Sequence, residues 1–316
     1  MQQYIMRRLL YSIPVMLVVS LLVSVLIRLQ PGDVVMAMMA EAGNINPALL
    51  DKIRHELGLD QPFHVQYVTW MFHFLTGNPG QSYWSGKPIT ELWSSAIPVT
   101  LELAFLALLI GLIVAIPVGI VTAVRRDSWV DHIGRLFAIS GLSMPDFWIG
   151  TLVLMFMGLW FHWIPKITYV GLFDDPVSNL QQFIVPAVVL GFRLSATTMR
   201  LTRSTMLEVL REDYIRTAWA KGLQERTVVA RHALKNALIP VITVAGTQLR
   251  FLLGGSLVIE VIFGLPGMGR LTYDAIIQRD YGLVQADIMF LAFLAVMLNL
   301  LVDLSYGWFD PRIRYN

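Results

Sequence analysis

Long apolar stretches constrain the fold of this chain more than any other feature of its sequence. A bilayer core of about 30 Å needs about 20 apolar residues in a helix. Four stretches meet that length, at residues 9–29, 97–124, 136–164 and 282–306. Two weaker stretches, 183–206 and 238–263, each contain an arginine, so hydropathy alone does not assign them.

The composition agrees with a chain that is partly dissolved in lipid. Hydrophobic residues make up 56% and charged residues 15% of the 316 residues, where a soluble domain has about 45–50% and about 25%. A disordered chain would be poor in apolar residues, so disorder is excluded. The net charge of +2 is too small to indicate a nucleic-acid partner. Because the chain has no cysteine, disulfides, iron–sulfur clusters and thiol nucleophiles are excluded too.

The distribution of positive charge favours six spans. Cytoplasmic loops carry an excess of Lys and Arg. With six spans and both ends inside, fifteen of the 24 basic residues lie inside and seven outside, while Arg193 and Arg250 lie within spans. Without the two weak spans, the eight basic residues from Arg200 to Lys235 would lie outside. We therefore predict an all-α integral membrane protein with six transmembrane helices and cytoplasmic N- and C-termini.

The same pattern divides the chain into four parts. Residues 1–29 form the N-terminal end and an uncleaved first span, because the apolar run is longer than that of a cleaved signal and no A-x-A-like site follows it. Residues 30–96 form an extracytoplasmic segment, with helices expected at 47–57 and 63–75 and a turn at 77–80. The other parts are a core of five spans, 97–306, with an inner loop at 206–240, and a cytoplasmic tail, 307–316.

No catalytic, cofactor or metal site is predicted. The stretch from Gly80 to Pro88 resembles a phosphate loop but has five residues between its glycines and a proline after the lysine, where the motif needs four residues and Ser or Thr. No two of the six histidines stand at the i, i+3 or i, i+4 spacing of paired helix ligands. Nothing resembles the G-x-S-x-G motif of a hydrolase. A membrane-bound enzyme is therefore disfavoured.

Charged residues inside the spans are costly and by default mark functional positions. The candidates are Glu102, Asp146, Arg193, Arg250, Glu260, Asp287 and Asp303. Arg193 and Arg250 lie nearest to mid-span. Two interpretations of these arginines stay equally open: they line a polar pathway, or they have a structural role, in which they pair with acidic groups between helices or extend to the membrane surface. Glu260, Asp287 and Asp303 lie near span ends, where a structural role is favoured.

Three residues are candidate hinges. Pro145 cannot donate a backbone hydrogen bond and is expected to kink or break the third span. Gly254 and Gly255 would permit close helix contact in the fifth span. All three are equally compatible with ordinary packing in a helical bundle.

The inner loop carries the most charge. Apolar residues recur at helical spacing on both sides of Gly222, which is a plausible helix stop, and a short second helix is expected over 225–234. Two amphipathic helices would then meet at the glycine. They could rest on anionic headgroups or dock a cytoplasmic partner.

The loop resembles a known family. The stretch from Asp213 to Gly222 (DYIRTAWAKG), continued from His232 to Pro240 (HALKNALIP), is similar to the EAA loop of inner-membrane permeases of binding-protein-dependent ABC importers, in the dipeptide, oligopeptide and nickel group. Arg216 occupies the place of the generic glutamate, as is familiar in the peptide branch. The motifs RLQPGD from Arg28, SMPDFW from Ser143, FGLPGMG from Phe263 and DPR from Asp310 resemble the first permease of such a pair.

The resemblance implies an ABC type I importer permease in a bacterial inner membrane, without a cofactor or enzymatic activity of its own. Its partners would be a second permease, two cytoplasmic ATP-binding subunits, an extracytoplasmic solute-binding protein and membrane lipid. The residues expected to couple to the ATPase are Asp213, Arg216, Thr217, Ala218, Ala220, Lys221, Gly222, His232, Asn236 and Pro240. Import of peptides is favoured, import of nickel or another small solute is the close alternative, and an ion-coupled carrier is a more distant one.

Overall fold

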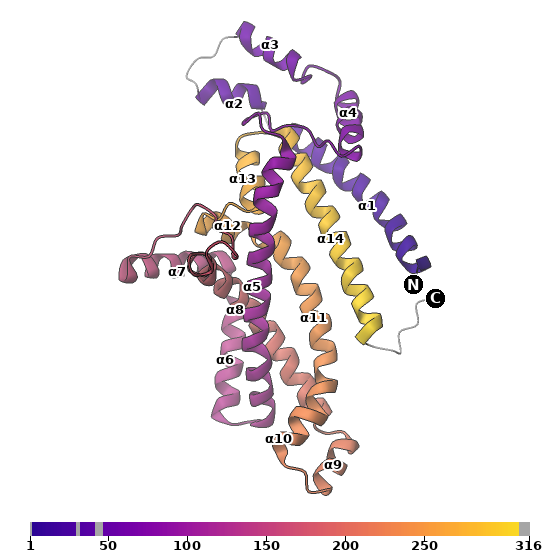
Figure 1. The fold of residues 1–316 in the computed structure, drawn as a ribbon, viewed down its shortest axis with the longest axis vertical. Helices are drawn as coiled ribbons and strands as arrows, with labels where there is room; N and C mark the ends of the chain where they lie inside the picture. The colour runs from indigo at the N-terminus through magenta and orange to yellow at the C-terminus, as the bar shows by residue number, and fades with distance from the viewer. Residues whose placement is uncertain (1, 30–31, 42–46, 310–316) are drawn as a thin grey trace. The chain divides into compact units, whose positions relative to one another are not determined.

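The computed structural model describes residues 2–29, 32–41 and 47–309. Arg312, Arg314 and the motif at Asp310 therefore lie outside the described residues. Within them the chain is helical, and an isolated bridge between Gln81 and Pro88 closes a turn. The helices are α1 (Gln2–Leu29), α2 (Val34–Glu41), α3 (Pro47–Glu56), α4 (Phe63–Leu75), α5 (Ile89–Val124), α6 (Trp129–Ser143), α7 (Asp146–Phe161), α8 (Pro176–Val209), α9 (Asp213–Ala220), α10 (Glu225–Thr227), a π-helical segment (Val228–Ala233), α11 (Leu234–Gly255), α12 (Leu257–Phe263), α13 (Met268–Ile277) and α14 (Tyr281–Phe309) (Figure 1).

Five helical segments of the described chain are long and apolar enough to cross a membrane. They lie in α1, α5, α8, the run from Glu225 to Leu252, and α14. A sixth span is formed if α6 and α7, which are bent by 102°, are counted together. The predicted number of six spans agrees with this count, and the sidedness of the loops stays a prediction.

The chain forms two compact units. The first contains the residues up to Thr100 and Pro266–Leu300, and the second contains Leu101–Leu265 and the described residues from Leu301 onward. In the first unit, Ile89 of α5 is buried with Leu283 and Val284 of α14. The buried carboxylate of Asp280 accepts hydrogen bonds from the Ser82 hydroxyl at 2.6 Å and the Trp84 backbone N–H at 3.1 Å. These bonds fasten the 81–88 turn to the start of α14.

The segment after α1 follows the prediction closely, with one addition. Helices α3 and α4 lie where helices were expected at 47–57 and 63–75, and Gly77 and Gly80 have positive φ values of 83° and 96°, as the predicted turn requires. Helix α2 was not predicted. Its Val34, Val35 and Met39 are buried with Leu50 of α3, so α2 is held by apolar packing.

The second unit is assembled on α8, and small residues let its helices approach closely. A Cβ atom added to Gly191 of α8 would lie 2.9 Å from the carbonyl oxygen of Ala107 in α5. On the other side of α8, a Cβ atom on Gly141 of α6 would lie 2.7 Å from the Cβ of Ala196. Glycine is therefore required at Gly191 of α8 itself and at Gly141 of the neighbouring α6.

The third span is broken at Pro145, as predicted. Helix α6 ends at Ser143, and α7 starts at Asp146 after a bend of 102°. Pro145 precedes α7 with φ −64° and ψ 140°, an extended conformation that cannot continue α6. The missing N–H of proline explains why the break lies here.

The expectations for the fifth span need two corrections. The span is two helices, α11 and α12, separated at Ser256. A Cβ atom on Gly254 would meet no described atom within 4 Å, so the predicted close helix contact is not formed at Gly254 within the described part of this chain. The close approach lies at Gly246, where a Cβ atom would be 2.8 Å from Val302. Hydropathy gave no means to choose among the glycines, because contact depends on which face of the helix meets a neighbour.

Candidate functional site

Helix α9 packs its apolar side against the ends of other helices in the second unit. Ile215 and Ala218 are the two buried residues of α9, three positions apart on one helix face. They join a buried cluster with Ala123 of α5, Met206 of α8, and Val228, Ala233 and Ala237 of the run that leads into α11. The predicted amphipathic helix is therefore formed, and its apolar face is covered by the chain itself.

Polar contacts anchor this helix further. The Asn236 amide donates to the Tyr214 hydroxyl at 2.7 Å, and the Thr217 hydroxyl donates to the Asp213 carbonyl at 2.9 Å. Arg216 lies 3.5 Å from Asp213, but both side chains are largely exposed. Such a pair contributes little to stability.

The turn after α9 is exposed and contains apolar side chains. Gly222 has φ +78°, and a Cβ atom there would meet nothing within 4 Å. Glycine is needed for this left-handed conformation, which confirms the predicted helix stop. Trp219 and Leu223 are 41% and 39% exposed beside it. The turn, residues 219–226, presents these side chains together with Lys221 and Arg226.

The second helix of the predicted pair is not a separate short helix. Helix α10 begins at Glu225, as expected, but the helical run continues through the π-helical segment and α11 to Gly255. The expected end at residue 234 and the role of Pro240 in closing the loop are therefore wrong. Pro240 lies inside α11, and neighbouring helices can satisfy backbone groups that a proline frees. The carbonyl that Pro240 leaves without its helical donor is that of Asn236, and the Thr205 hydroxyl of α8 donates to the adjacent carbonyl of Ala237 at 3.1 Å.

The predicted coupling residues thus fall into two groups. Asp213 to Gly222 lie on α9 and its turn, while His232 lies in the π-helical segment and Asn236 and Pro240 lie in α11 (Figure 1). π-Helical insertions are rare and occur frequently at functional sites. This segment joins the exposed turn to a helix that also contributes to a cavity.

A cavity of about 280 Å³ lies between the start of α7, α8 and α11. Its lining residues are Asp146, Leu190, Arg193, Leu194, Thr197, Val244, Thr247, Gln248, Phe251 and Leu252. An Arg193 side-chain nitrogen lies 3.0 Å from Oδ2 of Asp146, and the guanidinium carbon lies 5.4 Å from the ring centre of Phe251. The other oxygen of Asp146 is buried without a hydrogen-bond partner among the described residues.

Arg193 pairs with an acidic group, as one of the two interpretations expected, and it also lines this cavity. Its place in a polar pathway stays a prediction. Arg250 does not line that cavity, and its Nε is buried without a hydrogen-bond partner in the described part of the chain. The two arginines do not form one site. Sequence analysis missed Thr197, Thr247 and Gln248. Thr197 follows Arg193 by four residues, and Thr247 and Gln248 precede Phe251 by four and three residues. These are the spacings of neighbours on one helix face, so the sequence could have indicated that these residues lie beside Arg193 and Phe251.

Other charged residues in the spans have hydrogen-bond partners. Tyr169 donates to Glu102 at 2.9 Å, and Ser256 donates to the fully buried Glu260 at 2.9 Å. Asp287 accepts from Trp93 Nε1 at 2.7 Å and from the Thr272 hydroxyl at 3.1 Å. These contacts fit structural roles. No group of three or more His, Asp or Glu residues suited to a metal occurs among the residues described.

Comparison with known proteins places this geometry in a family. The family described as "Binding-protein-dependent transport system inner membrane component" matches residues 115–315, and its N-terminal counterpart matches residues 1–104. A protein of Brucella abortus (strain 2308), provisionally named a peptide transport system permease, is 42% identical over 316 residues. The glutathione transport system permease protein GsiC of Salmonella typhimurium (strain LT2) is 37% identical over 315 residues. Both alignments cover 100% of each chain.

Solved structures share the fold. An inward-facing structure of the MetNI methionine ABC transporter matches 69% of this chain and 96% of its own, with a TM-score of 0.53 and 19% identity. An amino acid ABC transporter crystallised with histidines matches 69% and 94%, with a TM-score of 0.51 and 17% identity. The family matches and the full-length relatives establish the family of this chain in addition to its fold. The chain belongs to the binding-protein-dependent transport system inner membrane components and is a multi-pass, non-enzymatic permease subunit of an ABC importer.

Proposed function

We propose that this permease imports peptides and is driven through the segment at 206–240. The two relatives described above, named for peptide and glutathione transport, support a peptide substrate. Nickel or another small solute is the alternative within the same mechanism. The proposal extends the family assignment to a substrate class and to a site of coupling.

The continuous helical run after the exposed turn is the observation that carries the coupling proposal. It starts at Glu225, next to the turn, and reaches Leu252, which lines the cavity. A continuous helix transmits displacement along its axis, and this run stays continuous through the π-helical segment and Pro240. A partner that grips Trp219 and Leu223 would therefore move Thr247 and Gln248, and with them one wall of the cavity.

The partners proposed are those of a complete importer. A second permease would complete the path, two cytoplasmic ATP-binding subunits would dock on the 219–226 turn, and an extracytoplasmic binding protein would deliver the substrate. This arrangement needs both termini and the 206–240 segment inside the cell, with residues 30–96 outside and a core at 97–306. The excess of basic residues from Arg200 to Lys235 supports that sidedness.

Within the path we assign a contact with substrate to Arg193 rather than to Arg250. Arg193 is 44% exposed at the cavity, so part of its guanidinium is free to bind a carboxylate. The break at Pro145 fixes Asp146 at the start of α7, opposite Arg193. A change in this bend would open or close the cavity, which supports Pro145 as the hinge, and no comparable geometry supports Gly254.

Transport by the complete importer in proteoliposomes tests the substrate class. We expect labelled di- and tripeptides to accumulate when ATP and the binding protein are both supplied. Accumulation of Ni²⁺ without accumulation of peptide would favour the alternative substrate. Uptake that continues without the ATP-binding subunits and stops with an ionophore would instead indicate an ion-coupled carrier.

A further inference from the structure

A cavity of about 470 Å³ between α6 and α8 is lined by three arginines. These are Arg135 of α6 and Arg200 and Arg203 of α8, and the remaining lining residues are Ala138, Ile139, Met199 and Ser204. All seven belong to the second unit. The cavity is distinct from the one at Arg193, because the two share no lining residue.

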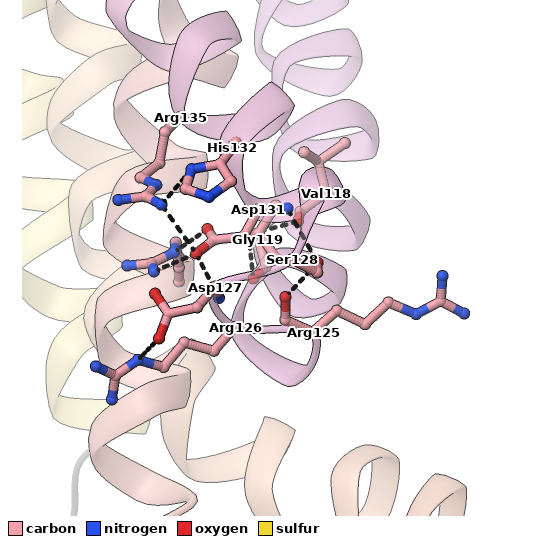
Figure 2. A network of polar contacts seen from close by, with 11 residues as sticks. Val118, Gly119, Arg125, Arg126, Asp127, Ser128, Asp131, His132 and Arg135 are labelled. Atoms are coloured by element: carbon pink, nitrogen blue, oxygen red, sulfur yellow. Dashed lines mark hydrogen bonds and ion pairs between the residues drawn. The ribbon is translucent and has the colours of Figure 1, made fainter.

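The positive charge of this cavity is only partly balanced. Asp131 is fully buried and accepts two hydrogen bonds from Arg203, at 2.7 and 2.8 Å. Arg135 lies 3.7 Å from the same carboxylate and contacts His132 at 2.7 Å (Figure 2). Arg200 forms no hydrogen bond or ion pair with any residue that the structure describes. No carboxylate of the described residues lines the cavity, and the acidic groups that act on Arg203 are Asp131 and Asp127.

The arginines lie near the ends of their helices. Arg200 is nine residues before the end of α8, and Arg135 is six residues after the start of α6. At 1.5 Å per residue they are about 14 Å and about 9 Å from those helix ends. Helix α8 has 34 residues and is about 51 Å long, so a centred α8 extends about 10 Å beyond each side of a hydrocarbon core about 30 Å thick. Arg203, about 9 Å from the end of α8, is then level with the headgroup boundary, and the long side chain of Arg200 reaches that level from one turn deeper.

Below the arginines the cavity is apolar. Ala138, Ile139 and Met199 form its walls. Ile139 continues an exposed apolar strip on α6 that includes Trp129, Ile133 and Leu136. Their spacing of three or four residues places them on one helix face. A cationic rim above an apolar wall matches a phosphate joined to acyl chains.

We propose that this cavity binds the headgroup phosphate of an anionic phospholipid. Arginine binds phosphate oxygens through paired N–H donors, and basic pockets between transmembrane helices bind anionic headgroups. The exposed Ser204 hydroxyl adds a donor at the rim. A zwitterionic lipid brings its own cation to the arginines, so a lipid with net negative charge is preferred. The bound lipid would hold α6 against α8 beside the Asp131–Arg203 pair.

Photolabelling of the complete importer tests the proposal. The importer is placed in nanodiscs of phosphatidylcholine with a trace of photoactivatable phosphatidylglycerol or photoactivatable phosphatidylcholine, and labelling of α6 is mapped by mass spectrometry. We expect labelling by the anionic probe to exceed labelling by the zwitterionic probe at least fivefold. Each arginine near a membrane surface contributes about 1 kcal/mol, or about fivefold, to binding of anionic lipid. Arg200→Gln should therefore lower labelling about fivefold, and Arg135→Gln with Arg200→Gln about 25-fold.

The control removes the same charge outside the cavity. Arg125→Gln with Arg126→Gln changes two arginines of the neighbouring α5–α6 turn that do not line the cavity (Figure 2), and labelling should stay within twofold of wild type. The proposal leaves Arg203 in place, since its loss would expose Asp131. Arg200→Gln alone removes no hydrogen bond or ion pair with a described residue. A loss of labelling in this variant would therefore not be explained by misfolding.

Three outcomes would overturn the proposal. Equal labelling by both probes that Arg200→Gln leaves unchanged would show an unselective apolar groove. Loss of labelling in 50 mM inorganic phosphate, at constant ionic strength, would assign the cavity to a free anion. Ile139→p-benzoylphenylalanine that crosslinks to the second permease and to no lipid would assign it to a protein interface.

Discussion

Arg203 donates two hydrogen bonds to the buried carboxylate of Asp131, from Nε at 2.7 Å and from a terminal nitrogen at 2.8 Å. Asp131 also accepts from the Asp127 backbone N–H at 3.1 Å and stands in the first turn of α6, after the Ser128 N-cap (Figure 2). One carboxylate therefore joins the α5–α6 turn to the last two turns of α8, 72 residues along the chain.

Arg203→Met is expected to destabilise the permease by about 3 kcal/mol, because it leaves a buried carboxylate without its partner. The measurement is the thermal midpoint of the detergent-solubilised importer. Arg126→Met, which removes an exposed ion pair with Asp127, should change it little. Adding Asp131→Leu to Arg203→Met should recover more than half of the loss, and equal midpoints for the two single variants would contradict the assigned role of the pair.

Gly191→Ala and Gly254→Ala should have opposite effects on stability. A methyl group at Gly191 would lie 2.9 Å from a backbone oxygen of α5, which neither helix can move easily, whereas one at Gly254 meets nothing within 4 Å. Overpacking at Gly191 is expected to cost about 1–3 kcal/mol. Alanine at Gly254 should be neutral or stabilising by up to about 1 kcal/mol. Thermal midpoints of the two variants check this, and equal loss in both would show that the α5–α8 contact is not tight.

Gly222→Trp should prevent the ATP-binding subunits from docking without unfolding the permease. No described residue lies within 4 Å of the added Cβ atom, so the bulk projects from the turn, and the left-handed φ adds about 1–2 kcal/mol of local strain. Peptide uptake is expected to fall at least tenfold, and the ATP-binding subunits should no longer co-purify. Gly222→Asn is the control, since asparagine tolerates positive φ. Normal uptake by the tryptophan variant would refute docking at this turn.

Substitutions at the Arg193–Asp146 pair separate a substrate contact from a structural one. Arg193→Met should abolish peptide uptake, but it also leaves Asp146 unpaired in a partly buried position. Arg193→Met with Asp146→Asn removes that unpaired charge. We expect the double variant to regain normal stability and to remain at least tenfold below wild type in uptake. Full recovery of uptake would mean that the pair only holds α7 against α8.

The His55–Asp60 pair between α3 and α4 should depend on pH and salt. Its atoms lie 2.6 Å apart, and this hydrogen bond, together with the carboxylate charge, raises the pKa of His55 and lowers that of Asp60. The contribution from His55 is complete below its ordinary pKa of about 6.5 and is lost as pH rises through the raised value. The contribution from Asp60 is complete above its ordinary pKa of about 3.9 and is lost as pH falls through the lowered value.

The interaction is therefore strongest between about pH 4 and about pH 6.5. An NMR titration of the His55 ring should give a pKa above the ordinary value. In the Asp60→Asn variant the pKa of His55 should return toward its ordinary value. The same should happen in the wild type at high salt, because both groups are exposed and salt screens their interaction. Asp51→Asn, on the same helix but outside the pair, should leave it unchanged. A normal His55 pKa in the wild type would contradict this pairing.

Local signals in the sequence were sufficient for some elements. Helix α4 lies over the predicted residues 63–75, because Pro62 precedes it and Gly77 follows it. The break at Pro145 followed from the missing N–H alone. Helix α2 was not predicted, because its residues VVMAMMAE are nearly all apolar and have no period that distinguishes a helix face.

Other features depended on tertiary contacts that no local pattern reports. Pro240 looked like a loop boundary, but packing of α11 against α8 keeps the helix continuous through it. Asp146 is 47 residues from Arg193, and they meet only because α7 turns by 102° from α6. Charge and hydropathy could identify both as intramembrane residues without indicating that they touch.

The π-helical segment at Val228–Ala233 leaves the chain with one residue more than an ordinary α-helix would need there. Deleting a single residue within it, such as Ala230, would let the backbone return to α-helical hydrogen bonding. The buried face of α11 with Ala237 and Val241 would keep its position. The exposed turn at the other end would rotate by about 100° around the helix axis. The spare residue thus sets the direction in which Trp219 and Leu223 point, and a family member without it would present this turn at a different angle.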